Sequence, residues 1–441
     1  MWRRAFLVVC VTFLAATVAA QEVRSKDGPG KAEVEELAWI TVGADAFETL
    51  KEHEDAFAAS RPLSRFGEVP GVVLTRVRLD DLDAISVVLH EAYRRCPGFV
   101  RHWTLADARR ALDALAAPPA REPEAYTIDQ PQAVARLTAA IEKPQILETI
   151  ERLSTDFNNR YHLHPSGTAA ALWIRDQWLA YAAGRPDVTV ELFDHASTDQ
   201  PSVILTIAGV TIPEEVVVLG GHLDSTSFNG GGTGNPNFIA PGADDDASGI
   251  AVLSEVVRVA MVENFHPQRT VSFMAYAAEE VGLWGSDEIA AAYQAAGVDV
   301  VAVLQQDMTD YFGSDEDIGL INDHTTPALT AFLGQLLDAY QPDLVWSLTA
   351  CGYGCSDHAS WNDRGFPAAF SFESLFGEHN PEIHTVDDTL ATLGNNVDHA
   401  AKFTRLAVAF MVEIAKEWFE PDIFADGFES GDTSAWSATV P

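Results

Sequence analysis

The sequence predicts an α/β protein with a mainly parallel (mixed) central sheet that has helices on both faces, preceded by a small α+β unit. Short apolar segments rich in β-branched residues alternate with segments of helical periodicity from about residue 126 to residue 418. Polar clusters directly follow three of these apolar segments. A chain of 441 residues is also too long for one small core, so we expect more than one folding unit.

Four segments of the main region predict strands because they are short, apolar and rich in β-branched residues. They are residues 203–207, 216–219, 271–276 and 300–304. Apolar residues recur at helical spacing over residues 247–262, which predicts an amphipathic helix packed on the sheet. The same pattern predicts a final helix that contains Phe403, Leu406, Phe410, Met411 and Ile414.

Residues 21–125 predict a separate small α+β unit. Its predicted strands are 37–42 and 72–77, its predicted helices are 44–57 and 79–93, and the Pro- and Ala-rich residues 117–123 predict a linker. In an exported hydrolase such a unit is often a pro-region, so we expect it to act on its own chain as an intramolecular inhibitor or chaperone. An ordinary accessory domain is the alternative.

The two ends of the chain differ from the rest. Residues 1–20 predict a signal peptide, with Arg3 and Arg4 before an apolar run and Val18 and Ala20 placed for cleavage. A membrane anchor is the alternative, but the apolar run is short for a bilayer span. We therefore expect a secreted or periplasmic protein. Residues 419–441 form an acidic tail that could be removed or serve sorting.

The charge and the cysteines narrow the partners and the compartment. The formal net charge of −37 repels phosphate backbones and anionic lipid surfaces, so we expect neither nucleic acid nor membrane as a partner. Cys10 would leave with the signal peptide. In an oxidising compartment Cys351 and Cys355 form a plausible disulfide, which leaves Cys96 unpaired.

Ligand-type residues gather where the working residues of an open α/β sheet are expected, just beyond the carboxyl ends of the strands. The polar clusters are residues 220–224, 277–280 and 305–307 after three predicted strands, 241–249 at the start of a helix, and 383–389 late in the domain. Taken singly, such residues are often helix caps or surface groups. Capping and solvation do not explain why so many of them follow strands.

Four motifs occur in order: Gly-Gly-His-Leu-Asp-Ser, Gly-Ala-Asp-Asp-Asp-Ala-Ser-Gly, Ala-Glu-Glu-Val-Gly-Leu and Ile-His-Thr. With these motifs, residues 126–418 resemble the co-catalytic di-zinc aminopeptidases of clan MH, particularly secreted bacterial leucyl aminopeptidases. The resemblance implies a zinc-exopeptidase-like fold and hydrolysis of the N-terminal bond of peptides with a free N-terminus. Enzymes of this type often act as monomers, so we expect a monomer.

The resemblance also implies a site with two Zn²⁺ ions per catalytic domain. Its metal ligands would be His222, Asp245, Glu280, Asp307 and His384. Asp245 would bridge both ions, with His222 and Asp307 on one and Glu280 and His384 on the other. Asp224 would orient the ring of His222. The peptide bond between Asp245 and Asp246 is expected to be cis.

In the same family pattern Glu279 is the general base for a water shared by the two zinc ions. Tyr353 resembles the donor to the tetrahedral intermediate. The substrate pocket would consist of Met308, Ile321, Phe372, Phe376 and His379, which favours a bulky apolar first residue. His379 stands where a tyrosine is expected, which leaves the side-chain preference open, and ordinary core packing is the alternative for each pocket residue.

Other chemistries have less support. No Gly-x-Ser-x-Gly motif occurs, and Ser356, Asp357 and His358 are consecutive, whereas catalytic triads assemble from separated positions. We therefore interpret these three residues as structural. Carboxypeptidase or glutaminyl cyclase chemistry on the same scaffold and a non-catalytic binding role are the remaining alternatives.

Overall fold

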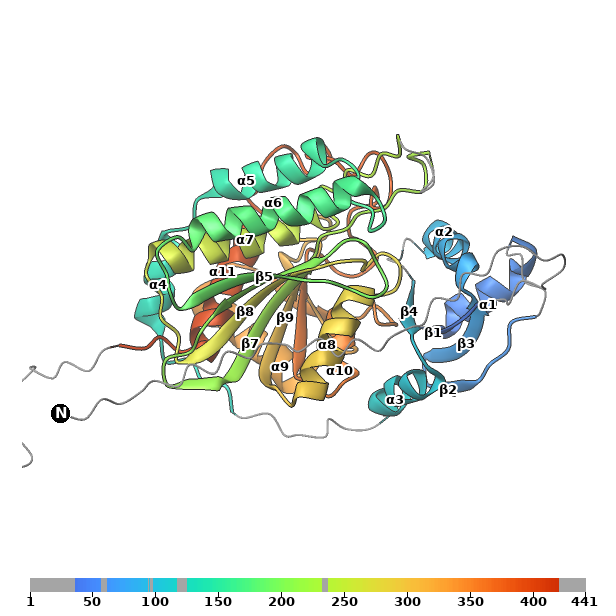
Figure 1. The fold of residues 1–441 in the computed structure, drawn as a ribbon, viewed down its shortest axis with the longest axis horizontal. Coiled ribbons are helices and arrows are strands. Elements are labelled where there is room, and N and C mark those ends of the chain that lie inside the picture. The colour runs from blue at the N-terminus through green and yellow to red at the C-terminus, as the bar shows by residue number, and fades with distance from the viewer. Residues whose placement is uncertain are drawn as a thin grey trace, which may run out of the picture. The chain divides into compact units, whose positions relative to one another are not determined.

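The computed structural model describes residues 36–56, 62–93, 95, 98–116, 125–231 and 237–419. The predicted signal peptide, Cys10, Cys96, the whole predicted linker and the tail from residue 420 lie outside these residues. The described residues contain one sheet of four strands and one of eight (Figure 1). None of their helices combines the length and the apolar character needed to cross a bilayer.

The smaller sheet belongs to residues 36–116, here called the N-terminal unit, and has the strand order β2-β3-β1-β4. The elements in chain order are β1 (Leu37–Gly43), α1 (Ala44–Glu52), a 3₁₀ turn (Glu54–Ala56), β2 (Gly67–Val69), β3 (Val72–Arg78), a 3₁₀ turn (Leu79–Asp81), α2 (Leu82–Tyr93), β4 (Phe99–His102) and α3 (Leu105–Ala116). All its strand pairs are antiparallel. The predicted α+β unit is thus present, with a first helix shorter than predicted.

The larger sheet has the strand order β11-β10-β12-β9-β7-β8-β6-β5. The strands are β5 (Val188–Phe193), β6 (Ser202–Ile207), β7 (Ile212–His222), β8 (Arg269–Tyr276), β9 (Asp299–Gln306), β10 (Ile318–Ile321), β11 (Trp346–Thr349) and β12 (Ala368–Phe372). The four central strands β8, β7, β9 and β12 are mutually parallel, and antiparallel pairs occur toward both edges. The predicted mixed, mainly parallel sheet is confirmed.

Helices cover both faces of this sheet. They are α4 (Pro131–Ala139), α5 (Lys143–Glu151) with a π-helical turn (Arg152–Asp156), α6 (Pro165–Tyr181), α7 (Ala247–Val262), α8 (Trp284–Ala296), α9 (Pro327–Tyr340), α10 (His358–Asn362) and α11 (Ala400–Ala415). Figure 1 shows α5, α6 and α7 on one side of the strands and α8 and α10 on the other. The predicted helix at 247–262 and the final helix are both present.

The two faces follow from the alternation of side chains along the strands. In β7, Val217 and Leu219 belong to the large core that includes α7 and α11, whereas Val216 and Val218 belong to the core beneath α8 and α10. Successive side chains of a strand point to opposite faces, so a strand between two helical layers must be apolar on both. This explains why the central strands are nearly continuous apolar runs.

The structure also contains four strands of the main sheet that the sequence did not predict. Two of them, β5 and β11, lie at the edges and are half-exposed, so their apolar pattern is weak. The other two, β10 and β12, are buried but contain glycine, alanine and serine, which have no strong strand preference. Pairing with neighbouring strands decides their conformation.

Candidate active site

The five predicted metal ligands converge at the carboxyl edge of the central strands. Strand β7 ends at His222, β9 ends one residue before Asp307, and Glu280 follows β8. They form two groups that share Asp245: His222, Asp245 and Asp307, and Asp245, Glu280 and His384. In each group one ligand atom per residue lies within 4.8 Å of the others, and every member is buried.

The spacing of these atoms fits bound metal ions. His222 Nε2 lies 2.9 Å from Asp245 Oδ1 and 3.6 Å from Asp307 Oδ1. His384 Nε2 lies 2.9 Å from Glu280 Oε2 and 3.1 Å from Asp245 Oδ2. Within the described chain, Asp245 Oδ2, Asp307 Oδ1 and His384 Nε2 nevertheless lack a partner with hydrogen-bond geometry. Buried nitrogen and oxygen lone pairs that crowd together in this way suit zinc, and the set contains no thiolate.

The charges of the site depend on one another. Burial raises the pKa of Asp245, but hydrogen bonds and charges from His222 and His384 outweigh burial and bring this pKa well below its usual value. Burial lowers the pKa of His384, but the charge of Glu280 and the contact with Asp245 raise it to about 10. In the metal-free protein the imidazoles therefore hold protons that a metal ion would displace.

A glycine lets the end of β7 approach its neighbours. A Cβ on Gly221 would lie 2.7 Å from the carbonyl oxygen of Gln306 and 2.9 Å from Asp246 Oδ2. Both contacts are closer than a side chain tolerates. Gly221 therefore brings His222 next to the end of β9, which precedes Asp307.

Three buried carboxylates outside both ligand groups bind the backbone of the ligand-bearing loops, and we call Asp224, Asp246 and Asp388 the backbone-binding carboxylates. Asp246 accepts hydrogen bonds from the amides of His222 (2.9 Å), Gly249 (2.8 Å) and Met308 (3.2 Å). It thereby joins the end of β7, the first turn of α7 and the residue after Asp307. The peptide bond between Asp245 and Asp246 is cis, as expected.

The other two backbone-binding carboxylates act on different loops. Asp388 accepts from the amides of Asp244 and Asp245, both at 3.1 Å. Asp224 accepts from the amides of Glu279 (2.9 Å) and Glu280 (3.2 Å). Asp224 was predicted to orient His222, whose Nδ1 lies 3.2 Å from the Asp224 carbonyl oxygen and 3.5 Å from its carboxylate. The carboxylate of Asp224 accepts hydrogen bonds from the loop that carries Glu279.

Glu279 is fully buried beside the two ligand groups without belonging to either. Burial raises the pKa of the Glu279 carboxyl group well above the usual range, although the charge of the nearby His222 opposes this effect. A carboxyl in such surroundings can hold a proton at neutral pH and release it when positive charge approaches.

The predicted pocket residues lie next to the ligand groups. Met308, Phe372, Phe376 and His379 line a narrow cavity of about 20 Å³ together with Tyr353 and Asp307. Ile321 belongs to the same apolar cluster but does not line the cavity. The predicted disulfide between Cys351 and Cys355 is present and flanks Tyr353.

Three residues near the site have hydrogen-bonding roles that the sequence did not reveal. Ser356, interpreted above as structural, donates a hydrogen bond of 2.6 Å to Asp307 Oδ2. Asp246 and Asp388 lie in clusters singled out above, but their identity as acceptors for backbone amides depends on contacts between distant segments. A carboxylate in a sequence does not reveal whether it will bind a metal or an amide.

The N-terminal unit contacts several loops of the site. His90 of α2 has its Nδ1 3.1 Å from His384 Nδ1, and its ring lies 5.1 Å from that of Phe228. The guanidinium of Arg95 lies 5.3 Å from the Tyr353 ring centroid. The outer nitrogen of one predicted ligand and the ring of the predicted oxyanion donor thus both face this unit.

Comparison with known proteins agrees with this site. Residues 202–411 match the model of peptidase family M28. A probable leucine aminopeptidase of Arthroderma benhamiae is 36% identical over 304 residues, which cover 67% of this chain and 81% of that protein.

Two solved structures from Legionella pneumophila are similar over almost their whole length. The aminopeptidase LapA is 27% identical with a TM-score of 0.72, and the alignment covers 87% of this chain and 99% of LapA. LapB is 29% identical with a TM-score of 0.72, and the alignment covers 86% of this chain and 100% of LapB. With the family motifs on strands that converge on a metal-type site, the chain belongs to peptidase family M28 and is a zinc-dependent aminopeptidase.

Proposed function

We propose that this chain is an exported aminopeptidase that holds two zinc ions and removes apolar residues from the N-terminus of peptides. The observation that carries the proposal is the sharing of Asp245 between two buried ligand groups, each completed by a histidine and another carboxylate. One carboxylate between two such groups suits a pair of adjacent ions. The signal-like residues 1–20 and the disulfide between Cys351 and Cys355 support export.

The positions of the residues support the following proposed roles. His222 and Asp307 would hold one ion, Glu280 and His384 the other, and Asp245 both. Zinc at these positions would supply an acidified water as nucleophile and polarise the scissile carbonyl group. Glu279 takes the proton of the attacking water and passes it to the leaving amine. The Tyr353 hydroxyl donates a hydrogen bond to the oxygen that gains negative charge.

The apolar lining of the cavity next to Asp307 supports an apolar first residue. Its volume of about 20 Å³ is about that of one water molecule, so a leucine side chain does not fit without movement. Phe376 is only partly buried and is the member most free to move outward. The proposed preference therefore includes displacement of Phe376 when a substrate binds.

The contacts of the N-terminal unit support a role as an intramolecular inhibitor. His90 lies against the predicted ligand His384, and Arg95 lies over the ring of Tyr353. The Arg101 guanidinium lies 4.2 Å from the ring centroids of both Trp103 and Trp284, of which Trp284 begins α8. A unit bound in this way would restrict access of a peptide to the site.

The reaction is tested on protein from which the N-terminal unit has been removed by limited proteolysis. Leucine-p-nitroanilide and its N-acetylated form are compared with and without a chelator, followed by zinc. We expect cleavage of the free-amine substrate alone, lost on chelation and restored by zinc. If neither substrate is cut while about two zinc ions stay bound, cyclase, carboxypeptidase or binding roles become better explanations.

Glu279→Gln tests the proposed base separately. We expect kcat to fall by about 10²- to 10⁴-fold with an unchanged zinc content, because the amide cannot accept the proton of the water. Glu214→Gln is the control, since Glu214 is exposed near the opposite end of β7. Full activity of Glu279→Gln would assign the base to another residue.

A further inference from the structure

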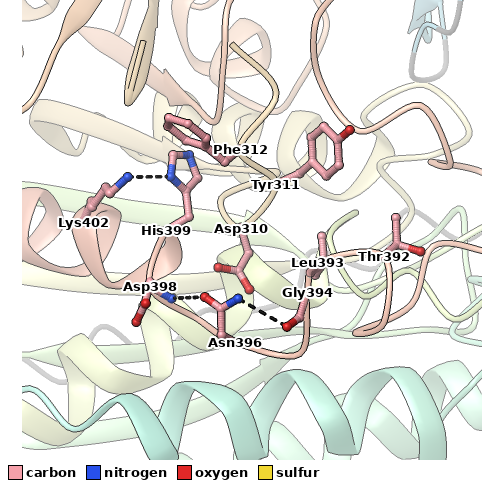
Figure 2. A pocket seen from close by; sticks show the side chains of 10 residues that line it. All are labelled: Asp310, Tyr311, Phe312, Thr392, Leu393, Gly394, Asn396, Asp398, His399 and Lys402. Carbon is pink, nitrogen blue, oxygen red and sulfur yellow. Dashed lines mark hydrogen bonds between the residues drawn. The ribbon is translucent and has the colours of Figure 1, made fainter. Parts of the chain in front are cut away.

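A second pocket lies between the loop that follows β9 and the loop that leads into α11 (Figure 2). Its volume is about 370 Å³. Asp310, Phe312, Leu393, Asn396, His399 and Lys402 are among its lining residues, and none of the five predicted metal ligands lines it. The pocket is therefore separate from the ligand groups.

Asp310 is the least exposed charged residue of this pocket, with 4% of its surface accessible. Its Oδ1 accepts a hydrogen bond of 2.9 Å from the amide of Ala400, at the start of α11. Its Oδ2 has no hydrogen-bond partner among the residues that the structure describes. Figure 2 shows the carboxyl group pointing toward Asn396 and the adjacent loop.

Such a carboxyl group lacks a counter-charge. Burial, with smaller contributions from the charges of Asp244 and Asp398, outweighs the Ala400 amide and Lys402 and raises the pKa of Asp310 to about 8. A carboxyl group buried in this way stays protonated at neutral pH, and it needs a positively charged partner to ionise. A cation in the pocket would meet that need.

The basic side chains of the pocket are already engaged. Lys402 Nζ donates to Asp317 Oδ1 at 2.7 Å and to His399 Nδ1 at 3.0 Å. His399 Nε2 donates to the carbonyl oxygen of Glu373 at 2.9 Å, and burial lowers the pKa of this ring to about 4, so it is neutral. The pocket's own groups therefore leave Oδ2 of Asp310 unpaired.

We propose that this pocket binds a primary alkylammonium group, whose nitrogen donates to Asp310 Oδ2 while its alkyl chain lies against Leu393 and Phe312. Leu393 is buried and Phe312 is 58% exposed, so together they offer an apolar wall and a rim. Peptide N-termini and free amino acids carry such a group, so substrates and products of the proposed reaction belong to this ligand class.

The single available oxygen distinguishes an ammonium from other cations. A guanidinium binds carboxylates best through both oxygens, but Asp310 Oδ1 is occupied by the Ala400 amide. A calcium ion needs six to eight oxygen ligands. Among the described residues, groups of three metal-type side chains occur only at the active site. An ammonium needs one strong acceptor and space for its chain.

Calorimetry on the zinc-loaded full-length protein with n-butylammonium tests the proposal. Saturating N-acetyl-leucine hydroxamate, which can chelate zinc but has no ammonium, occupies the metal site. We expect saturable binding that disappears in Asp310→Asn and persists in Asp315→Asn, whose carboxylate is exposed on the same loop. Binding that the hydroxamate abolishes, or that survives Asp310→Asn, overturns the proposal.

A second variant keeps the test independent of any folding defect of Asp310→Asn. In Phe312→Ala, which changes an exposed ring, we expect n-butylammonium to bind about 5- to 10-fold more weakly. Methylammonium, which has no chain to contact the ring, should bind as it does to the wild type. Unchanged binding of n-butylammonium, or an equal loss for both amines, would contradict the proposed position of the chain. Tetramethylammonium has no N–H donor, and if it bound as tightly as n-butylammonium, the proposed hydrogen bond to Asp310 Oδ2 would be wrong.

Discussion

At the scale of single residues, carboxylates in the site have two distinct tasks. Asp245, Glu280 and Asp307 point their oxygens into the ligand groups, whereas Asp224, Asp246 and Asp388 bind backbone amides of the loops that carry ligands. Several hydrogen bonds from backbone amides to one buried carboxyl group restrict a loop strongly. The second set would hold the first in position before a metal arrives.

We predict that Asp246→Asn weakens zinc binding by about 10- to 100-fold. The variant keeps one acceptor oxygen but turns an NH₂ group toward amide donors, so His222, Gly249 and Met308 cannot all keep their bonds. Competition with a chromophoric chelator measures the affinity.

Asp343→Asn is the matched control for this variant, since Asp343 is exposed and lies far along the chain. Circular dichroism in excess zinc would separate a positioning effect from loss of the fold. Wild-type zinc affinity in folded Asp246→Asn would show that the ligands need no such support.

At the scale of elements, the parallel strands determine where the site forms, and loops complete it. Strands β7, β8 and β9 deliver three of the ligands to one edge because their carboxyl ends coincide. The remaining ligands, Asp245 and His384, come from the turn before α7 and from a loop late in the domain. The N-terminal unit reaches the same edge through α2 and β4.

We predict that Arg101→Ala raises the initial rate of leucine-p-nitroanilide cleavage by the full-length protein. The change removes the cation–π contact with Trp284 of α8, which contributes about 0.5–2 kcal/mol, and so favours release of the N-terminal unit. The gain should disappear once the unit has been cut away. Arg109→Ala, an exposed change on α3, is the control. Equal rates for full-length wild type, Arg101→Ala and truncated protein would exclude inhibition by this unit.

At the scale of the whole molecule, the large acidic excess is partly concentrated inside the site, where burial and neighbouring charges alter protonation. The pKa of His384 is raised to about 10 and that of His222 well above its usual value, and Asp307 contributes to the latter. At neutral pH the metal-free site therefore holds protons on groups that must be neutral to bind zinc.

We predict that zinc affinity increases with pH between 6 and 8, by about tenfold or more per pH unit, because each ion displaces at least one proton. The sign follows from the raised histidine pKa values: acid favours the protonated, metal-free state. Chelator competition at pH 6, 7 and 8 gives the affinity, and a pH indicator in weak buffer gives the released protons. An affinity independent of pH, without proton release, would mean that the ligands are already deprotonated.

Much of the architecture could be predicted from the sequence because it depends on local patterns. The four predicted segments at 203–207, 216–219, 271–276 and 300–304 are strands, since their mostly apolar character reflects burial. The half-exposed edge strands β5 and β11 were missed because this character is absent from them. Three candidate ligands, His222, Glu280 and Asp307, follow strands, and four of the five candidate ligands stand in the family motifs.

The sequence by itself determined the fold class and three of the four central strands, because periodicity is a property of neighbouring positions, and its resemblance to a known family supplied the set of candidate ligands. Only the tertiary structure decided that Asp246 binds the amides of three separate segments, that His90 meets His384 and that Asp310 lies unpaired beneath a pocket. His90 and His384 are 294 positions apart. Such contacts depend on the packing of whole elements, and no local pattern encodes them.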